Sequence, residues 1–262
     1  MTFADELAFA LEIADIADAI TMPHYERRAF TVDRKPDRSE VTEADRETEA
    51  ALRTAVATSF PHHGFFGEEQ GVSGDLASPW RWIVDPIDGT SNFVRGIPVW
   101  ATLIALTHAQ HGPVVGVVSA PIMQRRWAAA AGHGATVNGL PIRVSTIDQL
   151  AEAQVCVTFS RGWDILGLTP QLVQLQQSAY RSRGFGDFWQ HMLVAEGAME
   201  IAVDAIGVQP YDLAAVQVVV EQAGGTFTDR LGVRTFESNS AVSSNGLLHR
   251  EAIDRIAPGY GR

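Results

Sequence analysis

The stretch Trp82–Gly96, WIVDPIDGTSNFVRG, places two acidic residues at the end of an apolar run. The run predicts a buried strand, and Pro86 ends it because proline cannot donate to the strand ladder. We expect Asp85 at the end of that strand and Asp88 in the turn that follows. An ordinary Asp-Gly turn would explain Asp88-Gly89 alone. The whole string after a buried strand favours a functional site.

The next three residues, Gly89, Thr90 and Ser91, predict the first turn of a helix. A helix start offers free backbone N–H groups and the positive end of the helix dipole, which together bind anions. One turn therefore combines two carboxylates that attract metal ions with a backbone that attracts phosphate. A phosphate held between cations and N–H groups would fit there.

Further acids stand at the ends of other predicted elements. Glu68 and Glu69 follow an apolar run in GFFGEEQG, where an exposed acidic turn is the plainer alternative. Asp45 lies in the first turn of a helix that begins at Thr42, and Asp212 opens the helix of YDLAAVQVVVEQAGG. Capping alone would explain either aspartate. Together the acids supply the oxygen ligands that Mg²⁺ prefers.

Composition limits the classes of protein that this chain can be. Its 262 residues, 46% of them hydrophobic, suffice for one large domain or two packed lobes. The formal charge of −11 argues against a nucleic-acid-coating protein. No apolar run is long enough for a membrane span, and the acidic N-terminal stretch is unlike a secretory signal. Cys156 is the only cysteine, so we expect no intrachain disulfide and a cytoplasmic location.

The sequence motifs of several other enzyme classes are absent from the chain. Haloacid-dehalogenase-type phosphatases separate their two aspartates by one residue, whereas Pro86 and Ile87 both lie between these two. The phosphate loop of kinases, the dinucleotide fingerprint and the serine nucleophile elbow do not occur. The histidines show no zinc-binding spacing.

The pattern of elements predicts layered α and β structure rather than an alternating doubly wound fold. Helical spacing marks the opening residues and the stretch from Thr42 to about Phe60, strands cluster from residue 80 to 131, and helices and strands alternate irregularly after residue 150. We expect an N-terminal lobe, 1–150, with most metal ligands, and a C-terminal lobe, 151–262, with the last ligand and the substrate pocket. The polar stretch TVDRKPDRSEV predicts a loop or a short hairpin.

Three motifs in this order resemble the signatures of the inositol monophosphatase family. They are GEE at 67–69, WIVDPIDGTSNF at 82–93 and YDLAAVQVVVEQAGG at 211–225, and VTEAD at 41–45 resembles the family's upstream aspartate motif. The stretches NFVRGIPVWATLIAL, GVVSAPIMQRRWAA, GFGDFWQHMLVAEGA and SSNGLLH are most similar to the actinobacterial histidinol-phosphate phosphatases.

The resemblance implies a layered αβαβα sandwich of the inositol monophosphatase/fructose-1,6-bisphosphatase type. It also implies two to three Mg²⁺ ions, for which Mn²⁺ can substitute, and an activated water without a covalent phosphoenzyme. The first ion would be held by Glu68, Asp85 and the carbonyl of Ile87. The second would be held by Asp85, Asp88 and Asp212, and a third, weaker ion would share Glu68.

The remaining site residues follow from the same resemblance. Gly89 and Thr90 would bind phosphate through their N–H groups, with Ser91 beside them. Asp45 would hydrogen-bond the Thr90 hydroxyl and orient the attacking water, so Asp45, Glu68 and Thr90 are the expected catalytic residues. The chain departs from the family at Tyr211, where tryptophan is usual, and at Ser91, where the actinobacterial group often has lysine.

Asp187 and Phe188 align with the family segment that lines the substrate pocket. Histidinol phosphate carries a cationic amine, which an acid at 187 suits better than it suits a polyol. Capping of the following helix is an equal alternative for Asp187. The family often has an acid where this chain has Ala205, and the neighbouring Asp204 takes that role if one residue is inserted.

Three hypotheses for function follow. The first is a Mg²⁺-dependent histidinol-phosphate phosphatase of histidine biosynthesis. The second is the same chemistry on inositol 1-phosphate or another small sugar phosphate, and the third is a non-catalytic metabolite-binding relative. The resemblance also implies a homodimer that binds a small phosphate ester, and the composition indicates neither a nucleic-acid nor a membrane partner.

Overall fold

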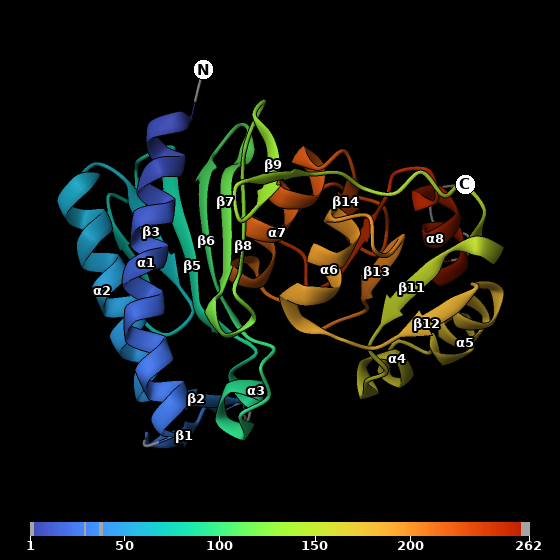
Figure 1. Ribbon diagram of the computed structural model, residues 1–262, viewed down its shortest axis with the longest axis horizontal. Coiled ribbons are helices and arrows are strands. Elements are labelled where there is room, and N and C mark those ends of the chain that lie inside the picture. The colour runs from blue at the N-terminus through green and yellow to red at the C-terminus, as the bar shows by residue number, and fades with distance from the viewer. Residues whose placement is uncertain (1–2, 29, 37–38, 258–262) are drawn as a thin grey trace.

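The computed structural model describes residues 3–28, 30–36 and 39–257. Its elements form five layers that alternate between helices and sheets (Figure 1). The layers are α1 and α2, an eight-stranded sheet, α6 and α7, a five-stranded sheet, and α5 and α8. This order confirms the expected αβαβα sandwich. The described helices are α1 (Ala4–Arg27), α2 (Glu43–Ser59), α3 (Thr90–Arg95), α4 (Arg161–Ile165), α5 (Thr169–Ser178), α6 (Asp187–Ala195), α7 (Pro210–Gln222) and α8 (His249–Ile256).

The eight-stranded sheet is antiparallel apart from one pair, β3 and β5. Its middle strands are buried on both faces because helices cover both sides, which explains their nearly continuous apolar sequences. In spatial order the strands are β10 (Leu140–Ile142), β9 (Gly134–Val137), β8 (Arg125–Ala130), β7 (Gly112–Ala120), β6 (Ala101–His108), β5 (Trp80–Asp88), β3 (Gly64–Gly67) and β4 (Gly71–Gly74).

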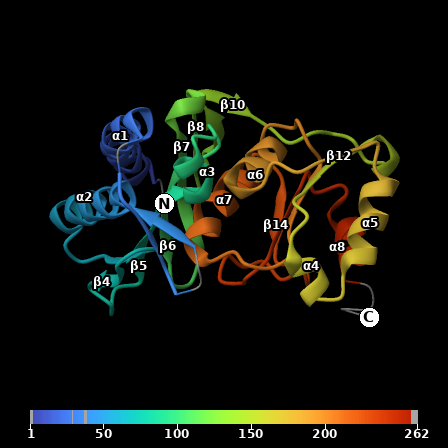
Figure 2. The same cartoon turned by 90° about the horizontal axis from the view of Figure 1, so that it is seen from below.

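The five-stranded sheet and a separate hairpin complete the strands. The sheet mixes parallel and antiparallel pairs in the order β12 (Arg181–Arg183), β11 (Gln154–Val157), β13 (Ile201–Asp204), β15 (Ala241–Ser244) and β14 (Thr226–Thr228). The hairpin of β1 (Val32–Arg34) and β2 (Glu40–Thr42) is one of the two forms expected for the polar stretch. In Figure 2 the same layers are seen from below.

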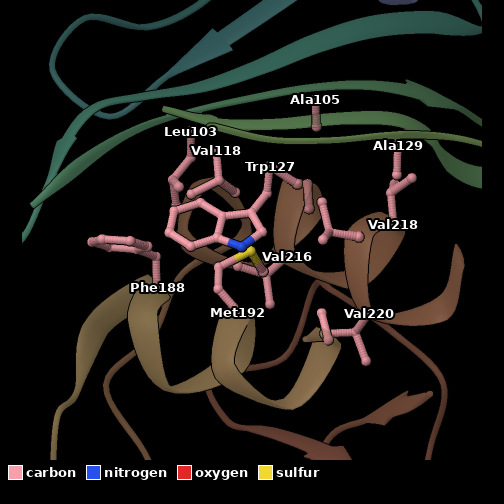
Figure 3. Packing of buried hydrophobic residues seen from close by; sticks show 14 of the residues in the cluster. Leu103, Ala105, Val118, Trp127, Ala129, Phe188, Met192, Val216, Val218 and Val220 are labelled. Carbon is pink, nitrogen blue, oxygen red and sulfur yellow. The ribbon is translucent and has the colours of Figure 1, made fainter. Parts of the chain in front are cut away.

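Helix α7 lies between the two sheets and contacts both. Every residue from Leu213 to Val220 is buried, because a helix enclosed on all sides has no solvent-facing stripe. Figure 3 shows Trp127 of the first sheet, fully buried, packed beside Val216 of α7 and Met192 of α6. The division into lobes 1–150 and 151–262 stays a prediction.

Strand β5 continues beyond the point where we expected it to end. Asp88 still pairs with Ala101 of β6, across a register shift that begins at Asp85. Pro86 lacks an N–H, but its carbonyl accepts a hydrogen bond of 2.8 Å from the Thr102 hydroxyl. The expectation of a strand end at Asp85 was wrong, because this side chain from β6 satisfies the irregular backbone and the sheet accommodates a bulge.

Candidate active site

Asp85, Asp88 and Asp212 meet at the end of β5. Each offers a carboxylate oxygen, and these oxygens lie within 4.8 Å of one another. Asp85 and Asp88 stand on either side of the β5 irregularity, and Asp212 stands in the first turn of α7. The bulge and the helix start therefore bring together acids that lie more than a hundred residues apart.

Each of these aspartates also accepts one backbone N–H, which fixes its carboxylate. The bonds are Ile87 N–H to Asp85 Oδ1 (2.9 Å), Phe188 N–H to Asp88 Oδ2 (2.6 Å) and Gln209 N–H to Asp212 Oδ2 (2.7 Å). Asp212 thereby closes a capping box with Gln209, so it caps α7 from the third helical position while facing the other two acids.

Burial and mutual repulsion make this cluster costly to ionise in the absence of cations. Burial raises the pKa of Asp85 well above its usual range, and the charges of Glu68, Asp88 and Asp212 raise it further. Burial raises the pKa of Asp212 to about 7, although the backbone hydrogen bond opposes the shift. Buried carboxylates of one sign, packed this closely, fit divalent cations, which neutralise them and take oxygen ligands.

The loop that carries Glu68 and Glu69 is held by a buried acid of α2. The Glu49 carboxylate accepts the N–H groups of Glu69, at 2.6 Å, and of Gln70, at 2.9 Å. A Cβ at Gly67 would lie 2.3 Å from the Glu49 carboxyl carbon. Position 67 therefore needs glycine, which explains why glycine precedes the two acids.

Lys35 of the β1–β2 hairpin reaches both loop acids. Its Nζ donates to Glu68 and to Glu69 at 2.7 Å each. Burial opposes the charge of Lys35, but the two acidic partners raise its pKa overall. Burial raises the pKa of Glu69 to about 7, partly offset by Lys35. Our sequence reasoning missed Lys35, although it is the only lysine in the chain, which was a usable signal.

Asp45 links the start of α2 to the predicted phosphate-binding turn at Gly89 and Thr90. Its Oδ2 accepts the N–H of Thr42 at 2.8 Å and the Thr42 hydroxyl at 2.6 Å, so Asp45 forms a capping box with Thr42 and has the capping role that the sequence allowed. Its Oδ1 lies 3.2 Å from the Thr90 hydroxyl, which is also 2.9 Å from the carbonyl oxygen of Ile87. One hydroxyl hydrogen thus faces two acceptors. Burial raises the pKa of Asp45 to about 6.

The predicted phosphate residues line one hollow of about 360 Å³. Gly89 has a φ of 83°, and a Cβ there would lie 3.0 Å from the Val99 carbonyl, so glycine suits both the left-handed conformation and the space. Helix α3 begins at the next residue, so its first N–H groups lack intrahelical acceptors. The lining residues are Arg34, Ser39, Glu40, Glu68, Gly89, Thr90, Ser91 and Arg95.

A second hollow, of about 160 Å³, adjoins the aspartate cluster and contains the predicted specificity acids. Asp88, Asp187, Asp204 and Asp212 all line it. Asp187 has a φ of 49°, and its carboxylate accepts a 2.8 Å hydrogen bond from the Asn92 amide. No side-chain cap is found at the start of α6, so capping does not explain Asp187. Burial, followed by repulsion from Asp204, raises the pKa of Asp187 to about 6.

Asp204 is held by two donors from α6. The Gln190 amide donates to it at 2.7 Å, and His191 Nε2 lies 2.8 Å from its other oxygen. The opposite ring nitrogen of His191, Nδ1, lies 2.7 Å from the Ser243 hydroxyl. Our sequence reasoning missed His191, although it stands one helical turn after Asp187 and so shares its face.

Phe188 lines the 160 Å³ hollow and Ser91 lines the 360 Å³ hollow, but the side chains of both have other contacts. The Phe188 ring is buried in the core, edge-on to Trp127 with ring centroids 5.9 Å apart, and its N–H contacts Asp88 (Figure 3). The Ser91 side chain is exposed and accepts a hydrogen bond from Arg95. Contact with substrate stays a prediction for both residues.

Comparison with known proteins shows the family to which the chain belongs. A family model described as the inositol monophosphatase family matches residues 4–258. The chain is 44% identical to a histidinol-phosphatase of Mycobacterium tuberculosis, over 97% of this chain and 99% of the relative. It is 40% identical to one of Streptomyces coelicolor, over 98% and 99%. The fold matches an inositol monophosphatase structure from Anabaena with a TM-score of 0.85 and 25% identity, over 97% and 96%. The chain belongs to the inositol monophosphatase family.

Proposed function

We propose that this protein hydrolyses L-histidinol phosphate to L-histidinol and phosphate with the help of two or three Mg²⁺ ions. Two histidinol-phosphatases that align over nearly the whole chain support this substrate. One structural observation carries the proposal. Two acids outside the metal cluster, Asp187 and Asp204, line the hollow that also contains Asp88 and Asp212.

The aspartate cluster would hold the ions. Asp85 would bridge them, with Glu68 and the Ile87 carbonyl on one side and Asp88 and Asp212 on the other. Bound ions of this kind lower the pKa of a water and stabilise developing negative charge. The Lys35–Glu68 ion pair would loosen when Glu68 becomes a ligand.

The chain's own residues would orient the reaction. Asp45 Oδ1, within reach of the Thr90 hydroxyl, would hold the attacking water on its line to phosphorus. The N–H groups at residues 89–91 would bind the phosphoryl oxygens. The water oxygen bonds to phosphorus and the water gives up one proton, the bond from phosphorus to the histidinol oxygen breaks, and the released proton ends on that histidinol oxygen.

The two specificity acids would bind the cationic end of the substrate. An amine between Asp187 and Asp204 would relieve the repulsion that raises the pKa of Asp187. Gln190 and His191 hold Asp204 in place, so its carboxylate is oriented before substrate binds. An inositol ring offers hydroxyl groups and no cation, so it would leave the repulsion in place.

An inositol phosphate or a small sugar phosphate is the second candidate. The fold shared with the Anabaena inositol monophosphatase supports the same phosphate chemistry on a polyol ester. The two acids beyond the metal cluster favour the amine-bearing ester. A metabolite-binding protein without catalysis ranks last because Asp85, Asp88 and Asp212 form a group that could hold a metal ion.

Phosphate release with Mg²⁺ from three esters tests the proposal: L-histidinol phosphate, myo-inositol 1-phosphate and fructose 1,6-bisphosphate. We expect the highest kcat/KM for L-histidinol phosphate. A preference of about tenfold for either other ester, about 1.4 kcal/mol of differential transition-state binding, would refute it.

Two further features stay predictions. We infer a homodimer from the family resemblance. We infer a cytoplasmic location from the single cysteine, Cys156, which is buried and unpaired. Separately, none of the described helices has the length and apolar character to cross a membrane.

A further inference from the structure

Asp187 opens α6 in a backbone conformation that residues with side chains rarely adopt. Its φ is 49°, and Gly186 before it has a φ of 71°. Glycine adopts such angles at no steric cost, whereas aspartate adopts them only occasionally. No side-chain cap is formed at the start of α6, so capping does not offset this conformation. A non-glycine residue kept in a strained conformation points to a function for its side chain.

A single donor holds the Asp187 carboxylate among the residues that the structure describes. The Asn92 amide nitrogen donates to Asp187 Oδ2 at 2.8 Å and to the Val99 carbonyl oxygen at 2.9 Å. A carbonyl oxygen and an ionised carboxylate can only accept, so the nitrogen of the Asn92 amide, and not its oxygen, faces both. Each amide hydrogen therefore has its own acceptor. Asn92 ties the start of α6 to α3 and to the segment before β6.

Asp204 differs from Asp187 because two donors hold it. The Gln190 amide lies 2.7 Å from one of its oxygens, and His191 Nε2 lies 2.8 Å from the other. Loss of either donor leaves Asp204 with the second one. Loss of Asn92 leaves the Asp187 carboxylate without a donor in the described part of the chain. The orientation of Asp187 therefore depends on one side chain outside α6.

The Asn92–Asp187 pair lies against the predicted phosphate-binding turn. A Cβ added at Gly89 would lie 3.4 Å from Asp187 Oδ2 and 3.5 Å from the Asn92 amide nitrogen. These are van der Waals distances, so both side chains border residue 89. In L-histidinol phosphate the amine is on the carbon next to the phosphate-bearing carbon, so amine and phosphate bind side by side. A carboxylate beside Gly89 is suited to an amine this close to the phosphate.

We propose that Asn92 is a positioning residue for substrate choice: it holds the Asp187 carboxylate beside Gly89, so that the site selects phosphate esters with an amine next to the phosphate. This role rests on the proposed function, because it concerns recognition of the amine-bearing ester. A carboxylate that is oriented before the substrate arrives need not be ordered on binding, which favours affinity. Asn92 acts through Asp187, so its loss should affect the choice of ester more than hydrolysis itself.

Asn92→Leu tests this role, because leucine has nearly the same shape and no donor. The ratio of kcat/KM for L-histidinol phosphate to kcat/KM for myo-inositol 1-phosphate is measured in the wild type, Asn92→Leu, Asp187→Asn and the double variant. We expect Asn92→Leu to lower the ratio about tenfold, mainly through a higher KM for L-histidinol phosphate. The double variant should lose no more than Asp187→Asn alone, because both substitutions act on the same contact. The exposed control Gln177→Leu of α5 should keep the wild-type ratio.

A second measurement needs neither substrate nor metal. Thermal unfolding of the same variants is followed at pH 8 with EDTA. Asn92→Leu should lower the Tm by about 2–4 °C more in the wild-type background than in the Asp187→Asn background, because only a charged carboxylate depends strongly on its donor. If the wild type prefers another ester, the proposed function fails, and this coupling alone decides whether Asn92 positions Asp187.

Three results would overturn the role of Asn92. They are an unchanged ratio in Asn92→Leu, equal losses on both esters, and the absence of coupling between positions 92 and 187 in the unfolding measurements. If Asn92→Leu does not fold, Asn92→Ser replaces it. The shorter serine side chain supplies one hydrogen in place of two, so the ratio should again fall.

Discussion

The acids of the two parts of the active site differ in what surrounds them. Asp85, Asp88 and Asp212 each accept one backbone N–H and otherwise have other acids as their charged neighbours. Asp187 and Asp204 are instead held by side-chain donors, from Asn92 to the first and from α6 to the second. Acids that face only acids are suited to metal ions. Acids that are already oriented by side-chain donors are suited to recognise a substrate cation.

Substitution within the metal cluster should have the largest effect. Asp88→Asn keeps the shape of the side chain and removes one negative charge. We expect kcat/KM to fall at least about a thousandfold for every phosphate ester, because the second ion loses a ligand. Phosphate release measures this. An exposed acid of α8 provides the matched control, Asp254→Asn, which should keep wild-type activity; an active Asp88→Asn would contradict the assignment of the metal cluster.

Mg²⁺ bound to the metal cluster should also reverse the way in which the free energy of unfolding depends on pH. The folded pKa of Asp212 is about 7, above its unfolded value, so the metal-free protein binds extra protons when folded. This stabilisation is present in full below about pH 4 and is lost as pH rises through 7. With Mg²⁺ the stabilisation instead grows as the pH rises, because the carboxylate ligands must be deprotonated to bind the ion.

Melting temperatures between pH 5 and 8, with Mg²⁺ and with EDTA, measure this reversal. We expect the gain from Mg²⁺ to grow with pH and to reach about 2.7 kcal/mol at a hundred times the Kd. A gain independent of pH would show that the buried aspartates are not the ligands.

Substitution of a specificity acid should act on one substrate only. Asp187→Asn removes the charge that faces the amine of L-histidinol phosphate. We expect kcat/KM for that ester to fall about 10- to 100-fold, the loss of one charged hydrogen bond, and kcat/KM for myo-inositol 1-phosphate to stay unchanged. Equal losses on both esters would assign Asp187 to the metal cluster instead.

The smallest effect on activity is expected for a residue that belongs neither to the metal cluster nor to the specificity acids. The Ser91 side chain is exposed and contacts Arg95, so Ser91→Ala removes little and keeps the backbone N–H. We expect kcat/KM to change by less than about twofold. A loss above tenfold would show that the Ser91 hydroxyl itself binds phosphate.

Much of the metal cluster could be predicted because its residues lie in short local motifs. The spacing of Asp85 and Asp88 and the capping box at Asp45 depend on neighbours in the chain, which a sequence displays directly. The bulge in β5 could not be predicted in this way, because it depends on the Thr102 hydroxyl of another strand. For the same reason the role of His191 in holding Asp204 became visible only in the folded chain.

The account's central claim is that metal and substrate are held by separate sets of acids. Calorimetric titration of Mg²⁺ into the wild type, Asp88→Asn and Asp187→Asn tests it most directly. The account predicts that Asp187→Asn binds as many ions as the wild type and that Asp88→Asn binds at least one fewer. Full binding by Asp88→Asn, or a lost ion in Asp187→Asn, would contradict it.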